Sequence, residues 1–417
     1  MFSNDPTNAA SDKPHHSGPL VGYKVLELCS TIAGPACARM LADFGADVIK
    51  VEPPEGDPMR SMGKHAGDVS LYAATLLRNK RAISIDLKTE EGKKIVRELA
   101  LKCDVLVENF RPGVMERLGL DYESLSKDHP GLVMVRISGY GQTGPYKNRP
   151  GYGAICEAFA GVRHLTGDPD RPPARVALAT TDYLTAVYAC YGTTMALLNR
   201  AKTGRGQVVD VALYEAAFSQ MEAYVPAFKT TQFVPNRVGS NLPNMAPNSL
   251  YQAKDGGYVL IAANSDATFK RLIEVMGQPE LIHHPLMSSI RVRGQNIPFC
   301  NEVVSAWTIQ HDGVDIERML IEAEVPVSRV YTMPDIFEDP HFAAREMLPQ
   351  IEHPILGPLT HPGVVPKLSS TPGEILRSGP NFGEDTRDVL RQELNYSQEQ
   401  LERLEAQKII FSAPAIA

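Results

Sequence analysis

The sequence has few cysteines, and no two of them form a CxxC pair. Its 417 residues include six, at positions Cys29, Cys37, Cys103, Cys156, Cys190 and Cys300. Zinc sites and the disulfide frameworks of secreted domains both need cysteines at close, regular spacing. The spacing therefore indicates neither, and we predict no metal ligands. We expect small buried thiols in a protein of a reducing compartment.

Positive charge and long apolar runs are also scarce. The formal net charge is -7, with 42 lysines and arginines against 49 acidic residues. A nucleic-acid-binding surface needs a basic excess, and a transmembrane helix needs about 20 predominantly apolar residues in a row. Residues 1–18 lack both the apolar core of a signal peptide and the arginine-rich pattern of a transit peptide. We therefore predict a cytoplasmic protein with a flexible N-terminus and with neither nucleic acid nor a membrane as partner.

What the chain does contain is an alternation of strand and helix patterns. Residues 23–28 and 47–52 are predicted strands, and residues 36–44 form a predicted helix between them. Further strands are predicted over residues 82–87, 104–109, 131–138 and 207–212. Such units build a parallel, doubly wound α/β sheet, whose ligands bind beyond the carboxyl ends of the strands.

Composition also marks domain boundaries. Residues 229–247 are rich in asparagine, proline, glycine and threonine, which is typical of a linker, and a hairpin with an Asp255-Gly256 turn follows. We predict five segments: a flexible N-terminus (1–18), a large domain (19–228), a linker (229–247), a small domain (248–328) and a return segment with the C-terminal part of the large domain (329–417).

One loop displays two aspartates. The glycines and prolines of residues 161–173 exclude a continuous helix or central strand, so Asp168 and Asp170 lie on a fixed turn. A rigidly held aspartate can cap a helix, join an ion pair, or attack an activated acyl group. The loop by itself favours the two structural roles and leaves the third open.

Residues 139–144 match the dinucleotide fingerprint GxGxxG. Pro145 and Pro150 follow, so no long helix can begin there to face a pyrophosphate. Glu52 closes a predicted strand and could bind a ribose, which leaves an NAD-dependent oxidoreductase as a weak alternative. Four cations lie at or just past strand ends, where a phosphorylated ligand would bind: Lys50, Lys88, Arg111 and Arg117.

Seven short motifs occur in order between residue 22 and about residue 390. They are Ala33–Pro35, Gly45–Glu52, Asn79–Arg81, Ile85–Lys88, Val107–Gly113, Gly139–Gly141 and Lys202–Gly206. Together they resemble the class III CoA-transferases, the family of formyl-CoA transferase and carnitine CoA-transferase. The resemblance implies an interlocked homodimer. Each subunit would have a large Rossmann-like domain built from both chain ends and a smaller α+β middle domain.

The resemblance also implies an activity and its residues. CoA would move from an acyl-CoA to a carboxylic acid, with coenzyme A as part of the substrate and no tightly bound cofactor. The family's catalytic aspartate matches Asp170, which would form a mixed anhydride with the acyl group and then an aspartyl-CoA thioester. The family's CoA contacts match Ile32, Ala33, Ile85, Leu87, Lys88, Asn109, Phe110, Arg117 and Tyr140. Arg163, Arg171 and Arg175 favour a small dicarboxylate, and hence succinyl-CoA as donor.

Two other roles that occur in the family remain alternatives for this chain. Its racemase branch moves an α-proton with a histidine, an aspartate and a further acid. Here Tyr152 stands at the histidine position, while Asp182 and Asp266 match the two acids. Without an imidazole, we interpret Asp182 as the cap of a helix over residues 183–201. A non-catalytic CoA-binding subunit is the second alternative, because some relatives work as paired unlike chains.

Overall fold

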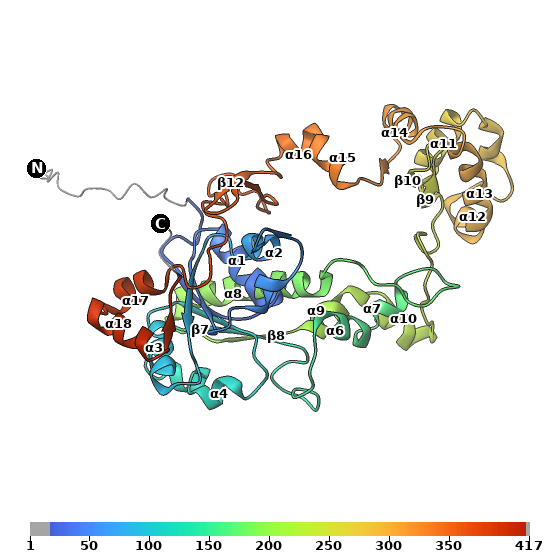
Figure 1. Cartoon of the computed structure of the whole chain (residues 1–417). Helices are drawn as coiled ribbons and strands as arrows, with labels where there is room; N and C mark the ends of the chain where they lie inside the picture. Colours follow the sequence, from blue (N-terminus) through green and yellow to red (C-terminus); the bar gives the residue numbers. More distant parts are fainter. Residues whose placement is uncertain (1–16, 414–417) are drawn as a thin grey trace, which may run out of the picture. The chain divides into compact units, whose positions relative to one another are not determined.

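The computed structural model describes residues 17–413, so most of the predicted flexible N-terminus lies outside the described residues (Figure 1). The chain divides into two compact units. Unit 1 comprises Met1–Ala160, Ala177–Met221 and Ala343–Ala417, and unit 2 comprises Gly161–Val176 and Glu222–Phe342. This division differs from the predicted boundaries in three places. The aspartate loop of residues 161–176 belongs to unit 2, the longer segment of unit 2 begins at residue 222, and that segment ends at residue 342 and not at residue 328.

Unit 1 is built on a seven-stranded sheet with the order β14-β5-β2-β1-β6-β7-β8. Its strands are β1 (Lys24–Leu28), β2 (Asp47–Glu52), β5 (Lys80–Ile85), β6 (Val105–Glu108), β7 (Val133–Ser138), β8 (Val208–Ala212) and β14 (Ile410–Phe411). Neighbours are parallel, except that β14 pairs with β5 in antiparallel fashion. Without β14 the order along the chain is 3-2-1-4-5-6, so the winding reverses between β1 and β6. The predicted α/β class with a large parallel sheet is confirmed.

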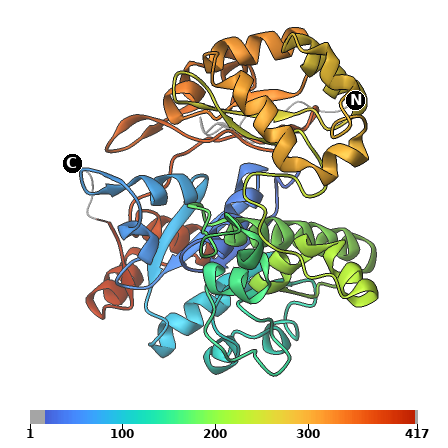
Figure 2. The ribbon, with the colours of Figure 1, turned by 90° about the vertical axis from the view of Figure 1, so that its right-hand side faces the viewer.

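Helices cover both faces of this sheet. On one face, valines of β1, β2 and β6 form a core with α1 (Ala33–Asp43) and α8 (Thr180–Thr203). Leu26, Ile49 and Leu106 point to the other face and pack against α3 (Glu90–Ala100), α17 (Thr386–Leu394) and α18 (Gln398–Ala406). The C-terminal helices, red in Figure 2, lie across the blue strands from the green α8. Burial on both faces explains why the strands read as continuous apolar runs.

Shorter elements complete unit 1. They are η1 (Pro58–Ser61, a 3₁₀ helix), β3 (His65–Ala66), β4 (Val69–Ser70), α2 (Leu71–Leu76), α4 (Val114–Leu118), α5 (Tyr122–Leu125), α6 (Gly153–Phe159), α9 (Leu213–Phe218), η2 (Ser219–Met221), β12 (Gln350–His353) and β13 (Gly357–Thr360). Helix α16 (Pro340–Ala344) spans the boundary between the units.

Unit 2 has a three-stranded antiparallel sheet, β11-β10-β9, with its own apolar core. Its elements are α7 (Val162–Leu165), α10 (Tyr224–Thr231), β9 (Asn248–Gln252), β10 (Tyr258–Ala262), α11 (Asp266–Val275), η3 (Pro279–His283), α12 (Ile290–Gln295), α13 (Ile297–Thr308), α14 (Gly313–Glu322), β11 (Val327–Arg329) and α15 (Met333–Glu338). The predicted hairpin is present as β9 and β10. In its turn the Gly257 N–H donates to Asp255 Oδ1 over 2.9 Å, and Gly256 adopts a φ of 84°.

Several helix ends follow local sequence rules. Thr89 caps α3, its hydroxyl accepting from the Gly92 N–H at 3.0 Å. Ser397 and Gln400 form a capping box at the start of α18. The prediction for α8 was wrong, because its N-cap is Ala179, which makes no side-chain hydrogen bond, and Asp182 lies inside the first turn. Within residues 17–413, no helix combines the length and apolarity that crossing a bilayer requires.

A buried histidine makes unit 1 sensitive to acid. His361 follows β13 and is fully buried, with its Nε2 3.2 Å from Ser378 Oγ. Burial, and next the Arg78 cation, lower the pKa of His361 to about 4. Its ordinary pKa is 6.5, so the unfolded chain gains a proton before the folded chain does. The contribution of neutral His361 to stability is therefore present above pH 6.5 and is lost as the pH falls toward 4.

Replacing this histidine tests the assignment. We expect the melting temperature of the wild type to fall more steeply between pH 7 and pH 4 than that of His361→Gln, because the variant has no group at this position to protonate. Differential scanning calorimetry across this range measures both slopes. The exposed His341→Gln is the matched control and should keep the wild-type slope. Equal slopes for all three proteins would contradict the assignment.

Candidate functional site

A cavity of 180 Å³ lies beyond the carboxyl ends of β1, β6 and β7, where the winding of the sheet reverses. The residues that line it follow these strands or come from neighbouring loops and helices. They are Ser30, Thr31, Ala33, Asn109, Phe110, Arg111, Pro112, Ile137, Ser138, Gly139, Lys147, Arg149, Pro150, Gly151, Tyr152, Asp182 and Leu213. We call this cavity the switch-point pocket. All of its lining residues belong to unit 1.

The floor of the switch-point pocket is formed by two hydrogen-bonded loops. The Ser30 N–H donates to Asn109 Oδ1 at 2.9 Å, and Asn109 Nδ2 donates back to the Ser30 carbonyl at 2.8 Å. The Phe110 N–H donates to the buried Glu108 carboxylate at 2.8 Å. Asn109 therefore joins the loop after β1 to the loop after β6.

The same Glu108 is paired behind the pocket. Arg136 Nε lies 2.7 Å from Glu108 Oε1, and its Nη1 lies 2.9 Å from Glu116 Oε1. Burial raises the pKa of Glu108 to about 7, and Arg136 limits that rise. The Glu108 carboxyl group, which accepts from the Phe110 N–H, is thus paired with the Arg136 guanidinium in the interior.

Asp182 is the one acidic residue among those that line the switch-point pocket. It projects from the first turn of α8 toward Gly153, the first residue of α6. A Cβ at position 153 would lie 2.1 Å from Asp182 Oδ2, so any larger residue there would displace this carboxylate. Burial, and next the charge of Asp182, raise the pKa of nearby Cys156 to about 11. The pocket therefore has one carboxylate, that of Asp182, and its cations are Arg111, Lys147 and Arg149.

Seven of the nine CoA contacts implied by the family lie in two places. Ala33, Asn109 and Phe110 line the switch-point pocket, and Ile32 is the N-cap residue of α1 beside it. Ile85, Leu87 and Lys88 lie at the carboxyl end of β5, two strands away from β1. Ile85 is buried in register with Ile410, whereas Lys88 is exposed.

The remaining two implied contacts lie on other elements. Arg117 is exposed on α4. The ring centroid of Tyr140 lies 5.2 Å from that of Phe159 and 6.0 Å from that of Tyr214. Arg149, a lining residue, covers the neighbouring Tyr146 ring at 3.4 Å.

Asp170, the predicted nucleophile, belongs to unit 2 and is exposed. Its turn is closed by a hydrogen bond of 2.9 Å from the Ala174 N–H to the Thr166 carbonyl. Within residues 17–413 the Asp170 carboxylate has no hydrogen-bond or ion-pair partner. Arg171 and Arg175 are also exposed residues of unit 2, and Arg163 lies on α7. The predicted turn is therefore present, but the switch-point pocket is lined without it.

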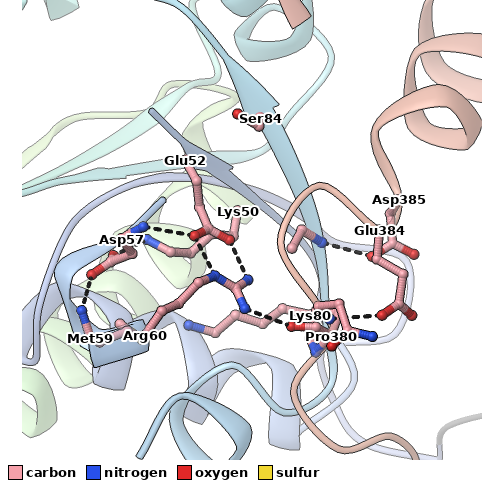
Figure 3. Close-up of polar contacts among 12 residues, drawn as sticks. Lys50, Glu52, Asp57, Met59, Arg60, Lys80, Ser84, Pro380, Glu384 and Asp385 are labelled. Carbon is pink, nitrogen blue, oxygen red and sulfur yellow. Dashed lines mark hydrogen bonds and ion pairs between the residues drawn. The ribbon is translucent and has the colours of Figure 1, made fainter. Parts of the chain in front are cut away.

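Two residues predicted to face a ligand are buried instead. Lys50 Nζ lies 2.8 Å from Asp57 Oδ2 and donates to the Cys29 carbonyl at 2.5 Å. Glu52 accepts from two nitrogens of Arg60, at 2.6 and 2.7 Å (Figure 3). Both side chains are fully buried, so Lys50 is not a phosphate ligand and Glu52 is not a ribose ligand. After the GxGxxG match, the next helix in the described chain is the short α6, which removes the basis for dinucleotide binding.

Sequence reasoning missed Lys147, Arg149 and the pocket location of Asp182. These residues come from separate segments that only the sheet topology brings together, and no local pattern marks them. Two signals were available: the rule that ligands bind where the strand order reverses, and the match of Asp182 to the aspartate of the racemase branch. Residues 17–413 contain no group of three or more histidines, cysteines or carboxylates that could hold a metal ion.

Known proteins resemble the chain over most of its length. The sequence pattern of CoA-transferase family III matches residues 20–386. The chain is 42% identical over 394 residues to a succinyl-CoA–D-citramalate CoA-transferase of Chloroflexus aurantiacus, covering 94% of this chain and 98% of that protein. It is 38% identical over 396 residues to the alpha subunit of a succinyl-CoA–L-malate CoA-transferase of the same organism, covering 94% and 92%.

A solved structure agrees with these sequence relationships. A CAIB/BAIF family protein from Brucella suis superposes with a TM-score of 0.81 and 33% sequence identity. The alignment covers 90% of this chain and 99% of that one.

The contact between Gly153 and Asp182 generates a test. We expect Gly153→Ala to lower the free energy of unfolding by about 1–3 kcal/mol, because the added methyl group meets the Asp182 carboxylate at 2.1 Å and displaces it. Thermal unfolding gives the loss, and a crystal structure of the variant gives the new position of the carboxylate. Gly131→Ala is the control, since its Cβ would meet other atoms only at 3.5 Å or more. An unmoved Asp182 in a fully stable variant would contradict the geometry.

Proposed function

We propose, from the premise that the chain belongs to CoA-transferase family III, that it moves CoA from succinyl-CoA to a small dicarboxylic acid in the switch-point pocket. The chain is a CoA-transferase, an enzyme that moves CoA between an acyl-CoA and a carboxylic acid. What the proposal adds is the substrate class, the site and the residue that carries the acyl group.

We propose that a carboxylate of the chain is this carrier, and two aspartates are candidates. The family motifs match Asp170, whereas Asp182 is the acidic residue of the switch-point pocket. Because that pocket lies at the sheet edge where ligands of such folds bind, its geometry supports Asp182. The proposal rests on this location of Asp182. Asp170 stays the alternative nucleophile, and the experiment below distinguishes the two residues.

The proposed reaction needs no external oxidant, reductant or metal. An Asp182 oxygen attacks the thioester carbonyl, the C–S bond breaks, and CoA leaves as a thiolate. The thiolate then attacks the aspartyl carbonyl of the anhydride, which releases the donor acid and leaves an aspartyl-CoA thioester. The acceptor carboxylate attacks this thioester and expels the thiolate again. Attack of the thiolate on the acceptor's acyl carbon forms the new acyl-CoA and frees Asp182.

Two observations support a dicarboxylate substrate. Both relatives named above act, by their names, on succinyl-CoA with either D-citramalate or L-malate. A substrate with a second carboxylate needs a cation in the pocket, and Arg111, Lys147 and Arg149 supply three. Arg149 is held over the Tyr146 ring, which fixes the direction of its guanidinium. These cations replace Arg163, Arg171 and Arg175 in the proposal.

No observation favours the racemase alternative. Tyr152 lines the switch-point pocket at the position of the racemase histidine, and none of the described residues that line it is a histidine. Asp266 lies in unit 2, where it pairs with Arg293 at 2.8 Å.

We propose that the enzyme acts as a homodimer. Several large apolar side chains of α8 are exposed in the single chain: Val187, Tyr188, Tyr191, Met195 and Leu198. A second copy would remove them from water. The interlocked arrangement, the cytoplasmic location and the absence of a tightly bound cofactor stay predictions.

Mapping the acylated residue tests the nucleophile. We expect Asp182→Asn to lower kcat at least about 10³-fold, because the amide cannot form the anhydride, while Asp170→Asn stays active. Hydroxylamine added with succinyl-CoA should place a hydroxamate on Asp182, as read by mass spectrometry of peptides. A hydroxamate on Asp170, together with an active Asp182→Asn enzyme, would return the role to Asp170.

A change of Arg149 tests the substrate class. We expect Arg149→Gln to raise the KM for L-malate or D-citramalate roughly 10–100-fold, the worth of one charge-assisted hydrogen bond. Initial rates at saturating succinyl-CoA give this value. Acetate is the control acceptor, because it has no second carboxylate and its KM should not change. Equal increases for both kinds of acceptor would assign Arg149 to CoA binding instead.

A further inference from the structure

The loop between β1 and α1 is held by side chains from other parts of the chain. Lys50 donates to the Cys29 carbonyl at 2.5 Å, and Asn109 makes both of its bonds to the Ser30 backbone. The Thr31 N–H donates to Asp57 Oδ1 at 3.1 Å. Thr31 has a φ of 65°, a conformation that costs free energy for a residue other than glycine. Three side chains thus fix three successive residues in a shape that the loop would not hold by itself.

Behind this loop lies a buried cluster of four charges. Lys50 lies 3.2 Å from Glu27 and 2.8 Å from Asp57, and Lys80 lies 2.7 Å from Glu27. All four side chains are almost completely removed from water. Lys80 also donates to the Pro35 carbonyl at 2.7 Å, in the first turn of α1. Two cations therefore face two anions, and the cluster has no net charge.

Such a cluster is a poor source of stability. Taking charges out of water costs several kcal/mol per ion. Replacing a buried ion pair by apolar residues of similar size therefore often leaves the stability of a protein unchanged or raises it. The charges instead fix the position of the backbone, because each cation also donates to a backbone carbonyl of the segment that lines the switch-point pocket. Ser30, Thr31 and Ala33 of this segment are lining residues.

We propose that Lys50, Asp57 and Asn109 are positioning residues for CoA transfer, which act by fixing the backbone of Cys29–Thr31 in the pocket. This inference rests on the proposed function of the switch-point pocket. It changes the role of Asn109, which the family resemblance implies as a CoA contact. Its amide oxygen and nitrogen are both engaged with Ser30, so the side chain serves the reaction through the loop.

A truncated donor separates positioning from contact with CoA. We expect Asn109→Ala to lower kcat/KM about 10²-fold, the effect of misplacing reacting groups by about 1 Å. The same factor should appear with succinyl-CoA and with succinyl-N-acetylcysteamine, which lacks the nucleotide half of CoA. A loss confined to succinyl-CoA would show that Asn109 contacts the nucleotide half, and would overturn the inference.

Conservative variants and a matched control complete the test. Asp57→Asn keeps an oxygen that can accept from the Thr31 N–H, so it should retain more kcat/KM than Asp57→Ala. We expect this difference whether or not the two variants have the same melting temperature. Asp43→Asn removes another buried ion pair, with Arg78 at 2.7 Å, away from the loop. It should lower the melting temperature and leave kcat/KM unchanged, and a loss of kcat/KM here equal to that of Asn109→Ala would overturn the inference. A wild type that transfers CoA from neither donor would instead refute the proposed function.

Discussion

The switch-point pocket of unit 1 depends on the ion pairs and the hydrogen bond of the buried Lys50 ammonium. Burial alone would lower the pKa of Lys50, but the carboxylates of Glu27 and Asp57 outweigh it and hold the pKa above its ordinary value. The ammonium therefore stays charged in the interior and must be satisfied on all sides. Its partners come from β1, from the loop after β1 and from the turn after β2. Removing either carboxylate would leave buried positive charge without its counter-charge, at a cost of about 3–5 kcal/mol.

The order of the strands explains why a pocket lies beside this cluster. The chain crosses from β1 to β2 and β5 on one side and then returns from β5 to β6 on the other side of β1, so the loops after β1 and β6 diverge. Asn109 bridges the two loops, and α8 brings Asp182 to the pocket from a segment more than 70 residues further along the chain. The site is therefore a product of topology, assembled on strands that are rigid because both faces of the sheet are buried.

Local rules predicted most of the parallel sheet and several helix ends, because each strand is a short apolar run and each cap a short-range pattern. They failed where long-range contacts decide. Lys50 sits in a strand and looks like a surface cation, yet partners distant in sequence make its burial possible. Asp182 has the sequence context of a cap, but the N-cap is Ala179 and the helix begins at Thr180. Strand β14 has two residues, too few for any periodic pattern, and only its pairing with β5 defines it.

That last strand has a consequence for how the protein is made. Strand β5 is paired on one side by β2, and its outer edge is covered by Asp385, Thr386 and residues 409–411, which come about 300 residues later in the chain. On the ribosome, this edge stays open until residues 385–411 have been made, and a nascent sheet with an open edge can recruit a strand from a neighbouring chain. These late segments thus close the sheet after the rest of it has been made, and a chain that stopped before residue 385 would expose the edge of β5 to aggregation.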